Sequence, residues 1–472
     1  MPINSFLYPG PSNSNPYVVD NSCMFNDGDS AFLSKTFSGD GTSHDIGTVS
    51  FWLKRGELGA EQGIFTAGAS ARNFIRIEAD DTLTFRSVGD SFHLQTTQVF
   101  RDPSSWYSII IAWDTSQGTA SDRVNFYVNG TQVTAFGTAT YPAQNLDIKL
   151  GAAELNCIGK DSEQTTPYFD GYLSEFVYID GQQLTPTSFG EFDENSPTIW
   201  KPKNVSGLTF GTNGFYLDFE DSGDLGDDES GNGNDFAETN LAATDQAIDT
   251  CTNNFCTWNS ANNPAGNGAN GNTQSASNNA KRFGASGTMG ANAGKWYWEV
   301  KLHSDSDANI AMIGIVSSTA ATTLVSDNYY PGYSSDSWGY YDNDGNKYNN
   351  NSSSSYGNSY AANDIIGVAM DLDNNKLYFA KNGTWQDSGD PTSGSTGTGA
   401  ISITNASNDF FLPAYGDSST GGYVRVQGNF GGIAGFSISS GNADANGYGN
   451  FEYAPPSGYY SLCTKNLAEF GG

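Results

Sequence analysis

The stretch at residues 364–385, DIIGVAMDLDNNKLYFAKNGTW, constrains the fold more than any other part of the sequence. Its mostly apolar run IIGVAM is followed by DLDNN and then by the aromatic run LYFA. Asp and Asn tolerate left-handed backbone and bond their own main chain, so DLDNN predicts a turn. Asn382-Gly383 favours the positive φ angles of a type I′ turn, and Asn129-Gly130 gives the same hairpin signal earlier in the chain. The pattern predicts two antiparallel strands and a tight hairpin.

Similar short patterns recur along the chain and predict an all-β protein. Aromatic residues make up 13% of the 472 residues, and segments rich in Gly, Asn and Ser separate the apolar runs. The apolar fraction of 37% is low but compatible with sandwiches whose strands face water on one side. We find no convincing amphipathic helix longer than about three turns. This length allows two or three domains, each with its own core.

The charge balance is strongly acidic. Lys and Arg number 21 and Asp and Glu number 52, which gives a formal net charge of −31. Such a charge opposes binding to nucleic acid, because phosphates require a basic surface. It favours solubility and repulsion between particles, and is also compatible with cation binding or a saline habitat. A solvated acidic surface is the simplest interpretation.

The cysteine count, together with the search for a secretory signal and a membrane span, indicates where the chain folds. Five cysteines cannot all pair within one chain, so we expect free buried thiols, although Cys251 and Cys256 could form a local pair or half of a metal site. The first residues have neither the basic segment nor the apolar core of a secretory signal. No stretch approaches the roughly 18 apolar residues of a membrane span. We therefore expect folding in a cytoplasm and no membrane insertion.

Changes in composition divide the chain into five parts. We predict an extended Pro-containing arm at 1–30, a first sandwich at 31–240, a linker at 241–283, a second sandwich at 284–455 and a tail at 456–472. The linker is placed by the run ANNPAGNGANGNTQSASNNA, which is almost all Asn, Gly, Ala and Ser. The arm has little to bury by itself, and we expect it to support assembly into a homo-oligomer.

The first strand-rich block resembles a laminin G-like, concanavalin A-type lectin sandwich. The resemblance rests on the motifs VSFWLKR, WYSIIIAWDT, VNFYVNGTQV and FDGYLSEFVYIDGQQL, which follow one another in the order of that fold. It covers about residues 30–240. The resemblance implies two packed antiparallel sheets of the jelly-roll type.

The second block resembles a SPRY domain over about residues 284–455. GKWYWEV and IAMIGIV precede the DLDNN turn, and FFLPAY and YVRVQGNF match the closing strands. An Asn/Ser/Tyr-rich insert at residues 343–362 departs from the family pattern and is expected to be an exposed loop. SPRY domains are bent antiparallel sandwiches that mostly bind proteins or peptides through loops and are not usually enzymes.

Further segments resemble virion proteins of tailed bacteriophages. These are TPTSFGEFD, the run GTNGFYLDFEDSGDLGDDESGNGNDF and the closing YAPPSGYYSLCTKNL. In such proteins a lectin-like sandwich forms part of a fibre or appendage. The resemblance implies a virion location, with other tail, portal or capsid proteins as partners.

Aromatic residues beside the insert are candidates for ligand binding. SPRY domains bind partners with loops in this part of the fold, and Tyr and Trp stack on sugars and anchor protein contacts. The competing interpretation is that Trp338 and Tyr340 fill the sandwich by alternation. The candidates are Tyr329, Tyr330, Tyr333, Trp338, Tyr340, Tyr341 and Tyr348.

The run DLGDDESGNGND is a candidate calcium site. It gathers carboxylate and amide oxygens, which calcium prefers, in a Gly-rich turn, and the ligands would be Asp224, Asp228, Asn232 and Asn234. The alternative is a turn held together by its own Asp and Asn side chains.

Signals for catalysis are missing from the sequence. The three histidines lie far apart, and neither H-E-x-x-H nor G-x-S-x-G occurs. Glu191, Asp193 and Glu194 form the nearest run to a glucanase carboxylate pair, and we interpret them as surface charge. Gly266-x-Gly268-x-x-Gly271 lacks the strand and helix of a dinucleotide site.

We therefore expect a non-enzymatic phage protein, a tail-fibre or appendage adhesin that binds a host-surface glycan or protein through its lectin-like and SPRY loops. Many copies would strengthen weak contacts. The alternatives are a capsid decoration or head-fibre protein, a glycan-cleaving tailspike-type hydrolase, and a cellular scaffold protein.

Overall fold

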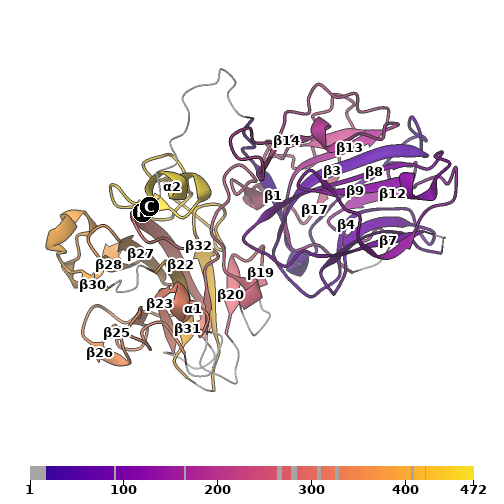
Figure 1. Ribbon diagram of the computed structural model, residues 1–472. Coiled ribbons are helices and arrows are strands. Elements are labelled where there is room, and N and C mark those ends of the chain that lie inside the picture. Colours follow the sequence, from indigo (N-terminus) through magenta and orange to yellow (C-terminus); the bar gives the residue numbers. More distant parts are fainter. Residues whose placement is uncertain are drawn as a thin grey trace.

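The chain folds into two antiparallel β-sandwiches that lie side by side in the computed structural model (Figure 1). The prediction of an all-β protein built from two linked antiparallel β-sandwiches is confirmed. The structure describes residues 17–89, 92–163, 166–262, 268–277, 284–305, 310–324, 329–404, 409–419 and 421–471.

The first sandwich contains two eight-stranded sheets. In spatial order, the first sheet consists of β10 (Thr131–Gln132), β9 (Val124–Val128), β8 (Trp106–Asp114), β3 (Ile46–Arg55), β13 (Gly171–Asp180), β1 (Ser22–Phe25) and β18 (Gln246–Ala247), with β16 (Phe215–Leu217) also paired to β13. The second consists of β11 (Phe136–Thr140), β7 (His93–Val99), β6 (Thr82–Ser87), β5 (Asn73–Ile77), β4 (Gln62–Ala67), β12 (Leu155–Ile158), β2 (Phe32–Thr36) and β17 (Ala237–Thr239).

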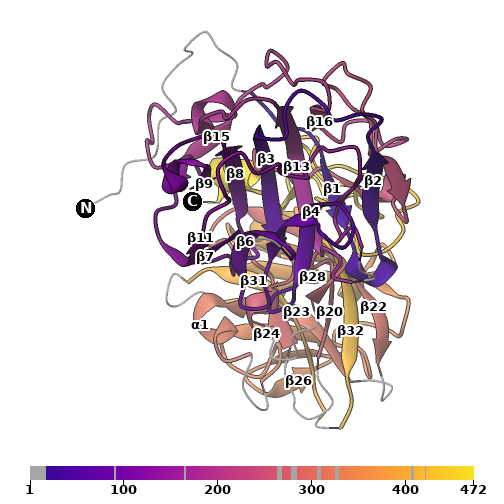
Figure 2. The same ribbon diagram turned by 90° about the vertical axis from the view of Figure 1, so that its right-hand side faces the viewer.

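The first sheet is buried on both faces. Its central strands β3, β8 and β13 lie side by side (Figure 2), and alternate residues such as Phe51, Ile109 and Leu173 enter the core between the two sheets. Residues on the opposite, outer face pack in two further clusters. One contains Ile110 and Val177, and the other is aromatic and consists of Met24, Trp52, Trp106, Tyr172, Trp200 and Ala247.

The second sandwich contains a nine-stranded and a six-stranded sheet. The larger runs β19 (Gly268–Ala269), β20 (Gln274–Ala276), β32 (Val424–Asn429), β22 (Lys295–Asp305), β27 (Ile365–Asp371), β28 (Lys376–Lys381) and β29 (Thr384–Trp385), with β30 (Ile401–Ser402) on β28 and β33 (Tyr460–Ser461) parallel to β22. The smaller runs β21 (Gly284–Ser286), β31 (Phe411–Asp417), β23 (Ala311–Ser317), β24 (Ser337–Tyr341), β25 (Lys347–Asn349) and β26 (Ser352–Ser354).

The stretch at residues 364–385 folds as its sequence predicts. Strand β27 pairs with β28 from Ile366 opposite Lys381 to Asp371 opposite Lys376. Asn382 and Gly383 have φ angles of 47° and 77°, as a type I′ turn requires, and connect β28 to β29.

The remaining regular elements are short. A small hairpin is formed by β14 (Gly190–Phe192) and β15 (Trp200–Pro202), and the α-helices are α1 (Ser318–Ala321) and α2 (Thr464–Phe470). Short 3₁₀ segments occupy Asp27–Asp29, Ala120–Asp122, Pro186–Ser188, Ala243–Asp245, Ser260–Asn262, Gln386–Ser388 and Pro391–Thr396. In the described ranges, neither helix has the length and apolarity needed to span a bilayer.

Regular structure begins inside the segment expected to be an extended arm. Strand β1 pairs with β13, and Cys23 and Phe25 are fully buried in the first core. The apolar run CMF is too short for a strand prediction from periodicity alone. The predicted arm at residues 1–16 lies outside the described residues.

The predicted linker at 241–283 also contains ordered structure. Strand β18 closes one edge of the first sandwich against β1, and β20 pairs with β32 in the second. Between them, residues 248–258 contact both sandwiches. Lys54 Nζ lies 2.6 Å from Asp249 Oδ2 and donates to the carbonyl of Phe255 at 2.8 Å, while the backbone nitrogen of Cys256 donates to the carbonyl of Leu462 at 2.9 Å. We call residues 248–258 the interface segment.

The insert at residues 343–362 is only partly exposed. Strands β25 and β26 form an outward hairpin at the edge of the smaller sheet. Tyr356 and Tyr360, however, are buried in the second core, where Tyr360 Oη donates to the carbonyl of Tyr340 at 2.8 Å. The prediction of an exposed loop therefore fails for these two residues, because their rings fill the sandwich.

Candidate functional site

Three of the seven predicted binding aromatics belong to the interior. Tyr340 is 0% exposed and stacks on Phe379, and Trp338 lies against Phe411. Tyr330 is also buried and donates to Asn351 Oδ1 at 3.1 Å. Strand alternation points Trp338 and Tyr340 inward, so the alternation interpretation holds for them. These three cannot contact a partner while the sandwich is folded.

The other four predicted tyrosines reach the surface as two pairs. The ring centroids of Tyr329 and Tyr333 are 5.4 Å apart, and those of Tyr341 and Tyr348 are also 5.4 Å apart. Tyr333 is 37% exposed and the other three are half-buried. We call these two contacts the tyrosine pairs. Tyr341 and Tyr348 lie beside the β24–β25 turn, whereas Tyr333 lies near the β25–β26 turn, where the backbone nitrogen of Asn350 donates to the carbonyl of Ser334.

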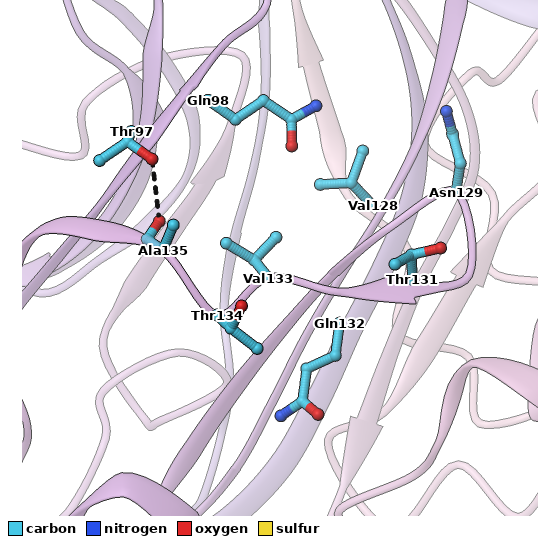
Figure 3. Close-up of a pocket in the computed structure, with 9 residues that line it drawn as sticks. All are labelled: Thr97, Gln98, Val128, Asn129, Thr131, Gln132, Val133, Thr134 and Ala135. Atoms are coloured by element: carbon cyan, nitrogen blue, oxygen red, sulfur yellow. Dashed lines mark hydrogen bonds between the residues drawn. The ribbon is translucent and has the colours of Figure 1, made fainter.

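A shallow hollow with a mixed polar and apolar lining lies at one edge of the first sandwich (Figure 3). It forms where the chain passes from β10, the edge strand of one sheet, to β11, the edge strand of the other. We call it the edge pocket. It has a volume of about 300 Å³ and is lined by Thr97, Gln98, Val128, Asn129, Thr131, Gln132, Val133, Thr134 and Ala135.

The β9–β10 hairpin fixes one wall of the edge pocket. Asn129 and Gly130 have φ angles of 48° and 74°, which confirms the hairpin expected from Asn-Gly. Asn129 Oδ1 accepts a hydrogen bond from the backbone nitrogen of Ser108 at 2.9 Å. A Cβ on Gly130 would lie 2.3 Å from the ring of Trp200, so the turn packs tightly on that ring.

The opposite wall comes from the end of β7 and the segment leading to β11. Thr97 Oγ1 donates to the carbonyl of Ala135 at 3.3 Å, and Gln132 Nε2 donates to Asn125 Oδ1 at 2.9 Å. The amide of Gln98 reaches over the hollow toward the valine side chains (Figure 3). Gln98, Thr131 and Thr134 are exposed.

The lining residues carry hydroxyl and amide groups and three small apolar side chains, but no ionisable group. Amides and hydroxyls both donate and accept hydrogen bonds. The pocket is therefore suited to an uncharged ligand rich in hydroxyl or amide groups. Sequence reasoning missed the edge pocket, because its lining residues come from the end of β7 and from a hairpin about 30 positions later in the chain. The polar runs QTTQ and TQVT were the available signal.

The predicted calcium loop holds itself together with hydrogen bonds. Asp228 Oδ1 accepts from the backbone nitrogens of Tyr216 and Ser230, each at 2.9 Å. Its Oδ2 accepts from Ser230 Oγ and from the backbone nitrogen of Asn234, each at 2.8 Å. With four donors on one carboxylate, few lone pairs are left for a cation.

The other predicted ligands are also oriented as turn residues. Asn232 Nδ2 donates to the carbonyls of Gly211 and Gly214 at 2.7 and 2.8 Å, and Asn234 Nδ2 donates to the Gly214 carbonyl at 2.9 Å. Asp224 is exposed and accepts from the backbone nitrogen of Gly226. This arrangement favours the Asp/Asn turn and does not fit a calcium site. Within the described ranges, no three His, Cys, Asp or Glu side chains gather as metal ligands.

Other predicted features behave as surface or core groups. Glu191 and Asp193 lie within 3.5 Å of Lys201 Nζ as exposed ion pairs. All five cysteines are free thiols, of which Cys23, Cys157, Cys256 and Cys463 are buried.

Comparisons with known families match two segments of the chain. Residues 27–188 match the family described as the concanavalin A-like lectin/glucanases superfamily, and residues 295–401 match the SPRY domain. Domains of both kinds are typically binding modules, which fits a non-enzymatic role in binding carbohydrate or protein.

Among curated proteins, the chain is similar to the ATP-dependent RNA helicase DDX1 of Xenopus laevis. The two are 31% identical over 100 residues, which is 21% of this chain and 12% of the helicase. The chain thus spans only a small part of that relative.

Solved structures with similar folds cover parts of the chain. The SPRY domain of human HERC1 is 17% identical, with a TM-score of 0.24, over 31% of this chain and 83% of its own. The heptameric SAP-like pentraxin of Limulus polyphemus is 19% identical, with a TM-score of 0.28, over 35% of this chain and 78% of the pentraxin chain. A proposed carbohydrate-binding protein from Bacteroides ovatus is 15% identical, with a TM-score of 0.31, over 48% of this chain and 59% of its own. Scores this low indicate nothing about ligands.

Proposed function

We propose that this chain, in which a concanavalin A-like domain precedes a SPRY domain, is a non-enzymatic adhesin of a tailed-phage virion. In this proposal the edge pocket holds an uncharged part of a host-surface glycan, and the tyrosine pairs make a second contact. The observation that carries the binding site is the lining of the edge pocket, which offers hydroxyl and amide groups without a charge. The virion location rests on the resemblance of residues 185–193, 211–236 and 453–467 to phage proteins.

The acidic surface supports an uncharged ligand. With a net charge of −31, the protein repels sialylated or phosphorylated glycans at long range. A pocket of this size holds a small part of a glycan chain, so each contact would be weak and several copies on one particle would supply the avidity.

Glycan binding is tested with the purified full chain on an array of neutral and acidic glycans. The double variant Gln98→Ala, Thr134→Ala should raise the Kd for a bound neutral glycan at least tenfold, about 1.4 kcal/mol, because it removes two exposed hydrogen-bonding groups. The control is Thr36→Ala, an exposed threonine of β2 outside the pocket. Equal affinity in the double variant and the control would remove the edge pocket from the proposal.

The virion location needs a separate measurement. A density map of the purified particle should place the chain at a tail tip or fibre end, and Tyr348→Ala should then reduce host attachment. Density over the capsid lattice would instead support a decoration protein. Absence from every particle would contradict a virion role altogether.

A further inference from the structure

A β-bulge interrupts β13, the central strand of the first sheet. The register with β3 shifts between Ser174 and Val177, and Glu175 in the bulge has a φ of 50°. This left-handed conformation is uncommon and strained for a residue with a long side chain. Bulges redirect side chains. Along β13, this bulge lies between the pairing with β1, which extends to Leu173, and the pairing with β16, which starts at Phe176.

The Glu175 carboxyl lies between two tyrosine hydroxyls at this gap. Tyr216 Oη donates to Glu175 Oε1 at 2.8 Å, and Tyr17 Oη donates to Oε2 at 3.0 Å. The two hydroxyl oxygens are themselves 3.1 Å apart. Glu175 is 6% exposed, so Tyr17 covers a carboxyl that would otherwise face water.

Residues 17–21, which carry Tyr17, are held on the outer face by hydrogen bonds and the burial of Val19, whose backbone nitrogen donates to Thr252 Oγ1 at 3.1 Å. Val19 is buried, and its carbonyl accepts from the hydroxyls of Thr250 and Thr252, each at 2.8 Å. Ser174 Oγ donates to the carbonyl of Asn21 at 2.9 Å. Val18 is 39% exposed. In the described part of the chain, strand pairing starts at Ser22, so residues 17–21 can detach without breaking a ladder.

The charge on Glu175 is unfavourable in the closed arrangement. Burial raises the pKa of Glu175 to about 7, although the hydrogen bonds from Tyr216 and Tyr17 lower it. The groups that face Glu175 are Tyr17, Tyr216, Asp218 and Glu220, together with the thiol of Cys251 from the interface segment. The two acidic neighbours raise the pKa of Glu175 further.

We propose that Tyr17, Glu175 and Tyr216 form a proton-controlled latch, which holds residues 17–21 on the sheet while Glu175 is protonated and releases them more often once it is ionised. Detachment of Tyr17 hydrates the carboxyl and brings its proton affinity closer to that of an exposed glutamate. Opening is therefore promoted as pH rises from about 5 to 7, and it levels off above the pKa of the closed form.

Hydrogen exchange of the backbone amides of residues 17–21 tests the latch in the full chain. The exchange rate of the wild type is divided by the exchange rate of Glu175→Gln at pH 5.5, 6.5 and 7.5. This ratio removes the intrinsic dependence of amide exchange on pH. Because the glutamine carries no ionisable charge, the ratio should increase about tenfold or more over this range. A ratio that stays constant would overturn the latch.

Two further variants keep the test decisive. Glu191→Gln changes an exposed acid of the same sandwich. The exchange rate of the wild type divided by that of Glu191→Gln should not change with pH. Tyr17→Phe removes one hydroxyl and keeps the ring, so it should accelerate exchange of residues 17–21 at pH 5.5 and leave β3 protected. If Glu175→Gln fails to fold, unchanged exchange in Tyr17→Phe would also overturn the proposal.

Discussion

At the scale of single residues, buried carboxyls link the stability of this acidic chain to pH. Asp342 follows β24 in the second sandwich and is 1% exposed. Burial raises its pKa to about 7, and the negative charge of Asp305 adds to the shift. A group whose pKa is raised on folding stabilises the folded state while protonated, so its contribution falls as pH rises through 7.

Asp342→Asn should therefore make the free energy of unfolding less dependent on pH in this range. Between pH 5 and 8 the wild type should lose about 3 kcal/mol more of its unfolding free energy than the variant, since one pKa unit is worth about 1.4 kcal/mol. Urea unfolding of both proteins at the two pH values measures the difference. The exposed Asp344→Asn in the same turn is the control, and a pH slope shared by Asp342→Asn and the wild type would contradict the prediction.

At the scale of elements, local sequence signals predicted the strands and hairpins but not the sites that they create together. The Asn129-Gly130 and Asn382-Gly383 turns formed as expected, because their φ angles depend on adjacent residues. The edge pocket and the burial of Tyr356 and Tyr360 depend on pairings between distant segments. Strands β1, β18 and β20 escaped prediction because each is too short to show a period.

The β9–β10 turn provides a test at this scale. Gly130→Ala should destabilise the protein by about 2–4 kcal/mol, because φ is 74° and the new methyl would meet the Trp200 ring. Gly59→Ala is the matched control, with a φ of 75° and no atom within 4 Å of the added Cβ, and should cost about 1 kcal/mol. Chemical denaturation measures both, and equal losses would show that contact with Trp200 is unimportant.

At the scale of the whole molecule, the interface segment joins the sandwiches through a buried ion pair. Lys54 and Asp249 are both buried, and Asp249 also accepts from Trp106 Nε1 at 3.0 Å. From the second sandwich, the carbonyl of Gly271 accepts a hydrogen bond from Tyr172 Oη at 2.7 Å, and Ile433 packs against the aromatic cluster on the outer face of the first sandwich. The composition of residues 241–283 predicted a linker. Asn, Gly and Ser suit the tight turns of an interface equally well, so composition alone did not separate the two.

Thermal unfolding tests this coupling. The wild type should unfold in one calorimetric transition, whereas Lys54→Met should lower the stability by about 3–5 kcal/mol, because it leaves the Asp249 charge buried and unpaired, and should separate the transitions of the two sandwiches. Lys201→Met removes only exposed ion pairs and should cost at most about 1 kcal/mol. Two transitions in the wild type would contradict the coupling.

The outer aromatic cluster has a consequence for how such a chain evolves by recombination. Trp52, Trp106 and Tyr172 lie on the first sandwich, but residues 248–258 and Ile433 cover them from beyond its sequence limits. A gene fragment ending where the lectin-like match ends, at residue 188, would carry these rings without their cover. A sandwich transferred alone would expose these rings, so we expect successful recombination to carry the interface segment with it.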